Sequence, residues 1–230
     1  NTDAEARRLA ESSKVTHFGY GIHPYHSNDG KTFLSLDNGD EVEVRIFGEH
    51  NMKNINAARL VLNRIGVTDE QFYNSIKSFK GAARRLENLI DNKEKGNVVF
   101  RDFAHAPSKV LATVNAIREK YPEKYFLAVF ELHTYSSLSE IFIDHYANCL
   151  DKCDRAVVFY DPHAVAVKKL DMMSDERIIK GFNRDDISVV HSKNELLDLI
   201  KTLNINNVVA GFMSSGDFNG LSTSDLCEIF

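Results

Sequence analysis

The sequence predicts an α/β protein, in which a Rossmann-like, doubly wound and mostly parallel sheet is preceded by a partial α/β region. From about residue 97 onward, short apolar runs alternate with segments of helical periodicity, which is typical of a parallel sheet covered on both faces. Earlier in the chain the pattern is a hairpin and two helices without a partner sheet. The length of 230 residues corresponds to roughly one and a half domains at about 150 residues per domain.

The parallel sheet is expected to contain five buried strands. Each candidate is a run of β-branched or aromatic residues, such as the continuous apolar run Tyr-Phe-Leu-Ala-Val-Phe. The candidates are residues 98–100, 125–130, 156–160, 187–190 and 208–210.

Helices are expected between these strands. In the first of them, Val110, Val114 and Ile117 share one helix face, and Pro107 suits the first turn. The expected helices cover residues 108–120, 136–150, 174–181 and 193–203.

The N-terminal region has the features of the end of a domain. Residues 15–20 have the composition of a strand, and residues 32–36 and 41–47 are expected to pair around an Asn-Gly turn. Helices are expected over residues 54–64 and 69–78, the second of them capped by Thr68.

A polar and charged segment, residues 80–96, is expected to be the hinge between two domains. The expected division is therefore residues 1–82, the end of a first domain, and residues 83–230, a complete second domain.

The overall composition excludes several classes of protein. Lys and Arg number 28 against 33 Asp and Glu, and this balance argues against a nucleic-acid partner. No apolar run approaches the roughly 20 residues of a membrane span, so no membrane partner is expected. The cysteines, Cys149, Cys153 and Cys227, fit buried thiols in a reducing cytoplasm.

The most informative segment is residues 48–58, at a predicted junction between a strand and a helix. A glycine ends the strand, and His50, Asn51 and Asn54 then gather near the start of the helix. Free backbone N–H groups and amide side chains there can bind an anion or the edge of a heteroaromatic ring. The alternative is that Asn51 and Asn54 only cap the helix.

Two further segments carry candidate binding residues. Residues 79–87 contain a basic pair that includes Arg85, suited to phosphate contacts or else simply solvated. Residues 101–108 follow a buried strand, where ligands of open α/β sheets bind, so Asp102 and His105 are candidates for ribose or phosphate contacts. Their alternative is an aspartate turn with an incidental histidine.

Residues 130–137 occupy the corresponding position after the next strand. Glu131 or His133 is expected to face the same crevice, while Ser136 or Ser137 could cap the following helix. Residues 160–163 and 214–217 end later strands and give weaker signals.

Standard phosphate and metal motifs are missing. Neither G-x-x-x-x-G-K-[ST] nor G-x-G-x-x-G occurs in the 230 residues. Cys149 and Cys153 lack a set of histidine partners, and His50, Asp102 and His105 do not have a ligand spacing, so no metal site is predicted.

Three motifs, in this order and spacing, resemble the Mur ligase family. They are G-x-H-N-x-x-N-x-x-A-A at residues 48–58, F-x-G-x-x-R-R at 79–85 and D-[FY]-[AG]-H-x-P at 102–107, and the match spans about residues 15–220. Mur ligases have a UDP-binding domain, a central ATPase domain and a C-terminal Rossmann-like domain. The resemblance implies that this chain supplies the end of the second domain and all of the third.

The resemblance also implies a reaction of bacterial peptidoglycan synthesis or recycling. With ATP and Mg²⁺, a carboxylate of a UDP-N-acetylmuramate substrate is phosphorylated, and the amine of an amino acid or peptide attacks the acyl phosphate. It implies that Asn51 and Asn54 contact adenine with His50 beside them, and that Arg85 lies near the phosphates. Asp102 would approach the ribose with His105 following it, whereas Glu131 and His133 are assigned to the substrate. Closure of two domains on the ligand would protect the acyl phosphate from water.

Within the family, residues 102–105 and the Phe130-Glu131 pair are most similar to murein peptide ligases. Those enzymes join the tripeptide L-alanyl-γ-D-glutamyl-meso-diaminopimelate to UDP-N-acetylmuramate. The alternative is the branch that adds L-alanine, whose H-R-Y-T-R motif is replaced here by residues 133–137 without either arginine. The D-N-P-R motif of the branch that adds diaminopimelate is absent.

The family's P-loop, Mg²⁺-binding carboxylate and carbamylated lysine precede the motifs present here, and the chain starts at Asn1 without Met. We therefore expect a fragment that has no ligase activity by itself. A doubly wound binding module without catalysis is the alternative from another class, since a fold alone does not fix a function.

Overall fold

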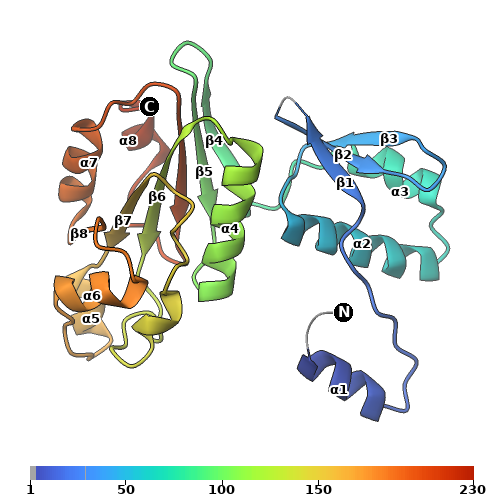
Figure 1. Cartoon of the computed structure of the whole chain (residues 1–230), viewed down its shortest axis with the longest axis horizontal. Helices are drawn as coiled ribbons and strands as arrows, with labels where there is room; N and C mark the ends of the chain where they lie inside the picture. The colour runs from blue at the N-terminus through green and yellow to red at the C-terminus, as the bar shows by residue number, and fades with distance from the viewer. Residues whose placement is uncertain (1–3, 29) are drawn as a thin grey trace. The chain divides into compact units, whose positions relative to one another are not determined.

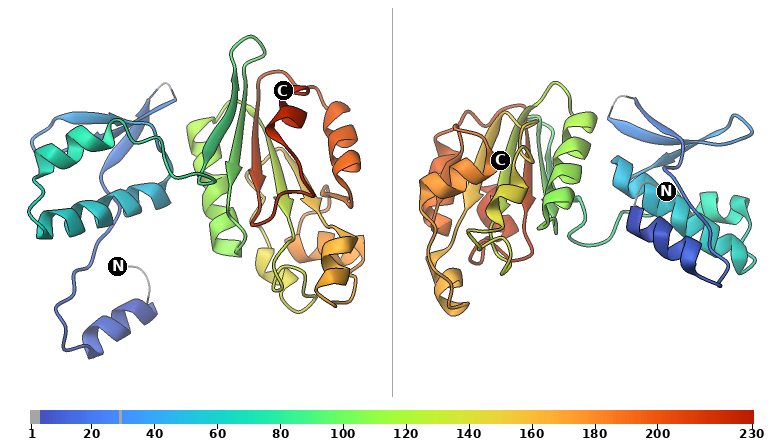
Figure 2. Two further views of the ribbon diagram at one scale, coloured as in Figure 1. Left: turned by 180° about the vertical axis from the view of Figure 1, so that it is seen from behind. Right: turned by 60° about the horizontal axis from the view of Figure 1, so that its bottom comes forward.

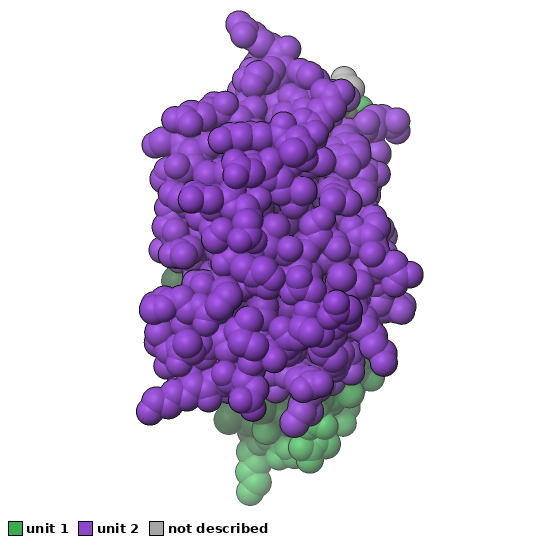
Figure 3. All heavy atoms as spheres, turned by 90° about the vertical axis from the view of Figure 1, so that its left-hand side faces the viewer, with its two compact units in different colours: residues 1–80 green, residues 81–230 purple. Residues whose placement is uncertain are grey.

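The computed structural model describes residues 4–28 and 30–230 of the chain. They form two compact units, Asn1–Lys80 and Gly81–Phe230, which we call unit 1 and unit 2 (Figure 3). Each unit has its own hydrophobic core and is described by itself.

Unit 1 contains a three-stranded antiparallel sheet. The sheet order is β1-β2-β3, and Thr32 of β2 pairs with Val44 of β3. The turn before β3 is closed by hydrogen bonds from Leu36 N–H to the Asp40 carbonyl and from Gly39 N–H to the Leu36 carbonyl, and Gly39 supplies the positive φ of 87° that an Asn-Gly turn needs. The predicted hairpin is confirmed. The strands are β1 (Tyr25–Asn28), β2 (Lys31–Ser35) and β3 (Glu41–Val44).

Two helices of unit 1 pack on this sheet. Alternate residues of the strands, such as Leu34 and Val42, meet Met52 and Phe72 in one buried cluster. Thr68 caps the last helix in a capping box with Gln71, as predicted. The helices of unit 1 are α1 (Ala4–Ser12), α2 (Glu49–Arg64) and α3 (Asp69–Ile76), and α1 has no buried residue.

The strand predicted over residues 15–20 is wrong. Its side chains are exposed, and no strand among the described residues pairs with it. β-branched and aromatic residues favour a strand only where a neighbour supplies hydrogen bonds and burial, so composition alone misled here.

Unit 2 is built on a six-stranded sheet in the order β4-β5-β9-β6-β7-β8. Only β4 runs antiparallel to its neighbour, and the other pairs are parallel. The five expected strands are all present, which confirms the mostly parallel α/β fold. The strands are β4 (Glu87–Asn92), β5 (Asn97–Asp102), β6 (Tyr125–Glu131), β7 (Arg155–Phe159), β8 (Ser188–Val190) and β9 (Val208–Met213).

Helices cover both faces of this sheet (Figures 1 and 2). On one face, Leu196 and Ile200 of α7 and Leu226 of α8 share a buried cluster with alternate strand residues such as Leu127. On the other face α4 lies close to β9, since a Cβ at Gly211 would be 2.7 Å from Ile117. The helices are α4 (Pro107–Lys120), α5 (Pro162–Val167), α6 (Asp175–Phe182), α7 (Lys193–Lys201) and α8 (Thr223–Cys227).

Two predictions for unit 2 are wrong. The segment 136–150 is not an α-helix but a series of turns with one 3₁₀ turn, η1 (Ile143–Tyr146). Several backbone N–H groups of this segment bond three residues back, such as Ser139 to Ser136 and Phe142 to Ser139, which makes turns instead of a continuous α-helix. The expected hinge 80–96 is also wrong in its second half, because residues 87–92 form β4 and pair with β5.

Candidate functional site

Most of the candidate residues of unit 2 lie where β5, β6 and β9 end. In the parallel register, Asp102 of β5 and Phe130 of β6 both pair with Met213 of β9. The carboxyl ends of these strands therefore share one edge of the sheet, the usual ligand edge of open α/β folds. We call this region the carboxyl edge. It comprises Arg84, residues 101–105, residues 131–133 and residues 214–218.

Asp102 is buried, at 5% exposure, and its carboxylate is occupied by protein donors. Leu86 N–H donates to Oδ2 at 2.7 Å, while Ala104 N–H and Thr113 Oγ1 donate to Oδ1 at 2.7 and 3.2 Å. Leu86 has a left-handed backbone, with φ of 45°, which is costly for a residue with a side chain. Asp102 therefore anchors the chain entering unit 2 and the turn that starts α4.

His105 has a defined orientation in the same turn. Its Nδ1 is 2.9 Å from the carbonyl oxygen of Phe103, and the Tyr146 hydroxyl donates to the His105 carbonyl. Because a carbonyl only accepts, Nδ1 carries the hydrogen in the neutral ring and leaves Nε2 as a proton acceptor. Burial raises the pKa of Tyr146, so this donor stays protonated.

Glu131 is the second buried carboxylate of the edge, at 3% exposure. Its Oε2 accepts from Ser214 Oγ and, at 3.0 Å, from Phe218 N–H. Its Oε1 lies 3.4 Å from Nδ1 of His133. Phe218 also has a left-handed backbone, with φ of 53°, so Glu131 holds the segment after β9 much as Asp102 holds Leu86.

Gly216 lies against this pair. A Cβ at this position would be 2.6 Å from His133 Nδ1 and 2.8 Å from Glu131 Oε2. Only a glycine leaves room for the histidine and the carboxylate to approach the 214–218 segment this closely.

The two neighbouring arginines differ. Arg84 is half-buried and donates to the carbonyls of Gly216 and Ser214, and its guanidinium lies 5.0 Å from the Phe103 ring. Arg85 is exposed, 5.4 Å from the same ring, and among the described residues its guanidinium has no hydrogen bond or ion pair. The Arg85 guanidinium is therefore unpaired among the described residues, whereas Arg84 holds the 214–218 segment.

Several buried polar atoms of the edge lack partners. Arg84 Nε, His133 Nδ1 and Ser215 Oγ have no hydrogen bond among the residues described. Buried polar groups are normally satisfied, so three such atoms in one region indicate a place where a polar ligand or water belongs.

The edge is divided between the two faces of the sheet. Thr113 of α4 bonds to Asp102, so this carboxylate lies on the α4 face. Arg101 and Glu131 share strand parity with Val99 and Val129, which face α7 and α8. Asp102 and Glu131 therefore lie on opposite faces of the sheet.

In unit 1, helix α2 begins at Glu49, five residues before the predicted start at Asn54. Its N-cap is Gly48, with φ of 88° and no side-chain cap. The alternative that Asn51 and Asn54 cap this helix is thus wrong. Asn51 Nδ2 donates to the Phe47 carbonyl at 2.8 Å, and Asn54 is exposed on the first turns. His50 lies beside them, half-buried.

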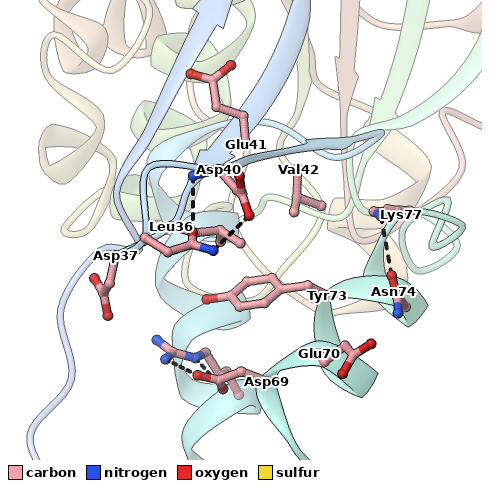
Figure 4. A pocket seen from close by; sticks show the side chains of 12 residues that line it. Leu36, Asp37, Asp40, Glu41, Val42, Asp69, Glu70, Tyr73, Asn74 and Lys77 are labelled. Carbon is pink, nitrogen blue, oxygen red and sulfur yellow. Dashed lines mark hydrogen bonds and ion pairs between the residues drawn. The ribbon is translucent and has the colours of Figure 1, made fainter.

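Unit 1 also contains a pocket that the sequence did not indicate. It has a volume of about 540 Å³ and lies between the β2–β3 turn and α3, with the Tyr73 ring at its centre (Figure 4). Arg59 and Asp69 form a bidentate pair in its wall at 2.8 and 2.6 Å. The Arg59 guanidinium lowers the pKa of Asp69 to about 2. His50, Asn51 and Asn54 do not line this pocket.

Among residues 4–28 and 30–230, no group of three or more His, Cys, Asp or Glu side chains is arranged to hold a metal. In unit 2, the unpaired Arg85 and the orphaned Nε of Arg84 are donors that an anion can satisfy. In unit 1, the exposed amide of Asn54 offers both a donor and an acceptor. No helix in the described part of the chain is long and apolar enough to cross a membrane.

Some residues of the edge were not found by sequence reasoning. Arg84 was seen only as part of a basic pair, Gly216 only as part of the weaker signal at residues 214–217, and Thr113 was not singled out. Their partners lie far away in the sequence, such as Gly216 for Arg84, so only the assembled sheet brings them together.

Comparison with known proteins gives the following relatives. No family model matches the chain. The UDP-N-acetylmuramate–L-alanine ligase of Streptococcus gordonii is 29% identical over 227 residues, which cover 94% of this chain and 49% of that protein. The chain thus spans about half the length of the curated relatives it matches.

Solved structures show the same fold. The UDP-N-acetylmuramate–alanine ligase of Thermotoga maritima matches with a TM-score of 0.65 and 18% identity over 86% of this chain and 43% of that chain. A murein peptide ligase of Psychrobacter arcticus matches with a TM-score of 0.60 and 20% identity over 89% of this chain and 42% of that chain.

Proposed function

We propose, from the support that these matches give to the Mur ligase family, that this chain carries the second half of an ATP-dependent ligase. The proposed reaction joins an amine to a carboxylate of UDP-N-acetylmuramate through an acyl phosphate. The observation that carries the proposal is the 29% identity to such a ligase along 94% of the chain. The carboxyl edge, with its free arginine and orphaned donors, is the place in unit 2 where ligands of this chemistry fit.

In unit 1, we assign Asn51 and Asn54 to the adenine, with His50 beside them. The structure removes the competing role of these asparagines as helix caps, since α2 starts at Glu49 after Gly48. An amide side chain offers both a donor and an acceptor, which matches the edge of an adenine ring.

In unit 2, we assign Arg85 to the nucleotide phosphates and Asp102 to the ribose. Arg85 is exposed and without an ion pair among the described residues, so its guanidinium is free to bind a phosphate group. Asp102 is already satisfied by Leu86, Ala104 and Thr113, so a ribose hydroxyl must displace one of these donors or share an oxygen with them.

His105 is assigned a proton-transfer role. ATP, when bound, supplies the phosphoryl group that activates the substrate carboxylate. The attacking amine must lose a proton, and His105 has Nε2 free to accept one because Nδ1 is engaged by Phe103. The proposed consequence is that, in the full-length ligase, His105→Gln lowers turnover more than it weakens nucleotide binding.

For the amine substrate we favour the tripeptide L-alanyl-γ-D-glutamyl-meso-diaminopimelate, with Glu131 and His133 at its site. This choice rests on the Phe130-Glu131 pair and on the absence of arginines at residues 134–137. Glu131 is buried against the 214–218 segment, so in this proposal it positions His133 and that segment and does not contact the substrate. His133, with 37% of its side chain exposed, is the residue proposed to contact the substrate.

L-alanine is the second candidate for the amine. It is favoured by the curated relatives, which are UDP-N-acetylmuramate–L-alanine ligases. Binding of both compounds to the chain can be compared directly by isothermal titration calorimetry with saturating ADP. Tighter binding of the tripeptide supports the first assignment, and tighter binding of L-alanine supports the second.

The chain alone is proposed to bind nucleotide but not to turn it over. No P-loop motif occurs in its 230 residues, so the phosphates lack the backbone cradle that such a loop provides. The test is ADP and ATP binding by calorimetry together with a phosphate-release assay. Binding that Arg85→Gln weakens at least about tenfold supports the proposal, because hydrogen bonds between charged partners are the stronger ones. Absence of any nucleotide binding would favour a binding module of another kind.

A further inference from the structure

The turn that carries His105 enters α4 without the usual side-chain cap. The N-cap of α4 is Ala106, whose methyl group cannot accept a hydrogen bond. The other helices of unit 2, α5 to α8, each begin at an Asp or Ser side chain that accepts a backbone N–H of the first turn. The path of residues 103–107 is therefore set by contacts other than a helix cap.

Two of these contacts come from the segment that contains η1. The Tyr146 hydroxyl donates to the carbonyl oxygen of His105, 41 positions earlier in the chain. Cys149 donates its thiol to the carbonyl oxygen of Pro107 at 3.4 Å. Burial raises the pKa of Cys149 to about 11, so the thiol keeps the hydrogen that this contact needs. One segment thus holds two carbonyls of the turn.

The ring of Tyr146 is itself fixed by packing. It is fully buried, stacks on Phe182 of α6 with the ring centroids 5.4 Å apart, and lies 5.2 Å from the Phe130 ring of β6. On the same side, a Cβ at Gly181 of α6 would be 2.7 Å from Ile143, so η1 and α6 are in close contact. A ring enclosed in this way cannot turn aside without opening a void, so its hydroxyl has a fixed position beside the turn.

The state of the His105 ring depends on the same turn. Its Nδ1 is 2.9 Å from the carbonyl oxygen of Phe103, and the two rings lie edge to face at 5.2 Å. In a neutral histidine, the hydrogen bond made by one ring nitrogen decides which nitrogen carries the hydrogen. A shift of the backbone that Tyr146 holds would change the contact between Nδ1 and the Phe103 carbonyl, and with it the nitrogen that is left as a proton acceptor.

We propose that Tyr146 is a positioning residue for His105. By holding the His105 carbonyl, its hydroxyl fixes residues 103–107 in the geometry that places the ring hydrogen on Nδ1 and leaves Nε2 as the acceptor. This proposal rests on the proposed function and deepens it, because it adds a residue that prepares the proton acceptor and does not itself touch the substrate or the nucleotide.

The test is ¹⁵N NMR of the histidine ring nitrogens in the 230-residue chain. Tyr146→Phe removes only the hydroxyl and keeps the ring between Phe130 and Phe182. At about pH 8.5, where an ordinary imidazole is neutral, we expect the wild-type chain to show His105 as a single tautomer with its hydrogen on Nδ1. In Tyr146→Phe we expect a mixture of both tautomers, together with shifted amide signals of residues 103–106.

Tyr160→Phe is the matched control. Tyr160 is as buried as Tyr146, but its hydroxyl accepts from Met173 N–H at 2.8 Å and has no contact with the turn of His105. Each variant removes one buried hydroxyl and its hydrogen bond, so both should lower the urea midpoint of unit 2 by similar amounts. Only Tyr146→Phe should change the His105 tautomer, which separates positioning from a loss of stability.

Three results would overturn the proposal. They are a Tyr146→Phe chain with the His105 ring signals of the wild type, an equal change of those signals in Tyr160→Phe, and a wild-type chain in which His105 already shows both tautomers. Titration of the same samples with ADP tests the proposed function separately. A wild-type chain that does not bind ADP would contradict the proposed function, while the comparison of tautomers would still decide the role of Tyr146.

Discussion

Two buried carboxylates at the carboxyl edge of unit 2 have similar positions and different surroundings. Asp102 ends β5, Glu131 ends β6, and each accepts the backbone N–H of a distant residue with a left-handed backbone, Leu86 and Phe218. Asp102 accepts from three donors on both oxygens. Glu131 accepts its hydrogen bonds on one oxygen and leaves the other facing His133 at 3.4 Å.

This difference separates a carboxylate that anchors the protein chain, Asp102, from one that can also take part in ligand binding, Glu131. A carboxylate that accepts from protein donors on both oxygens fixes a strained segment, and a ligand must displace one of these donors or share an oxygen with them. A carboxylate with one oxygen beside an orphaned histidine nitrogen still has capacity for a ligand or a proton. We infer that the Asp102 side of the edge is mainly preformed and that the Glu131 side changes more on binding.

The largest expected effect is the loss of the Asp102 anchor. Asp102→Ala leaves the N–H groups of Leu86 and Ala104 and the hydroxyl of Thr113 without their acceptor. We expect the free energy of unfolding of unit 2 to fall by about 3 kcal/mol or more, since each buried donor left unsatisfied costs about 1–3 kcal/mol. Urea denaturation followed by NMR signals of β6 and β9 measures this.

Glu131→Ala is the matched control for this variant. It removes the acceptor of only two protein donors, so its effect should be smaller than that of Asp102→Ala. An equal or larger effect would contradict the distinction between the two carboxylates.

A second prediction concerns the close contact on the Glu131 side. Gly216→Ala places a Cβ within 3 Å of both His133 and Glu131, which must move apart. We expect a loss of about 1–3 kcal/mol, typical of overpacking, together with changed chemical shifts of the His133 ring signals. Gly21→Ala, where a Cβ meets nothing within 4 Å, is the control and should be nearly neutral. Unchanged His133 signals in Gly216→Ala would show that residues 214–218 are not in close contact with His133 and Glu131.

The smallest effect is expected from a partly exposed carboxylate in unit 1. Asp69 has three hydrogen bonds, from Arg59 and Asn63, but 44% of its side chain is exposed. Its pKa is lowered from 3.8 to about 2, chiefly by the hydrogen bond from Arg59. Because the folded pKa lies below the unfolded value, this stabilisation is present above about pH 4 and is lost as the pH falls toward 2.

Solvent screening keeps the contribution of this pair to about 1 kcal/mol or less. Asp69→Asn should remove that part of the pH dependence of unit 1, as measured by urea denaturation at pH 2.5 and 6. A loss as large as that of Asp102→Ala would mean that exposure does not distinguish carboxylates in this protein.

The sequence predicts the sheet of unit 2 well because its parallel strands are continuous apolar runs, such as residues 125–130. Prediction from the sequence fails where the residue composition of a segment suggests one structure and its tertiary surroundings impose another. Residues 15–20 have strand-like residues but no partner strand among the described residues, and residues 136–150 have helically spaced apolar positions but form successive turns. The edge strand β4 was missed because only its pairing with β5, and not its polar sequence, defines it.

The candidate site shows the same limit. Asp102 and Glu131 could be found because each directly follows an apolar run, and a strand end is a position that sequence can locate. The role of Gly216 could not, because it comes from a close approach to His133 and Glu131. Contacts between residues more than 80 positions apart exist only in the folded sheet.

The most direct test of the account is to map nucleotide binding on the whole chain by NMR. Titration with ADP should shift the signals of Asn51 and Asn54 in unit 1 and of Arg85 and His105 in unit 2. Shifts confined to the 540 Å³ pocket around Tyr73 would contradict the account, and so would the absence of shifts at residues 51–54 and 85–105.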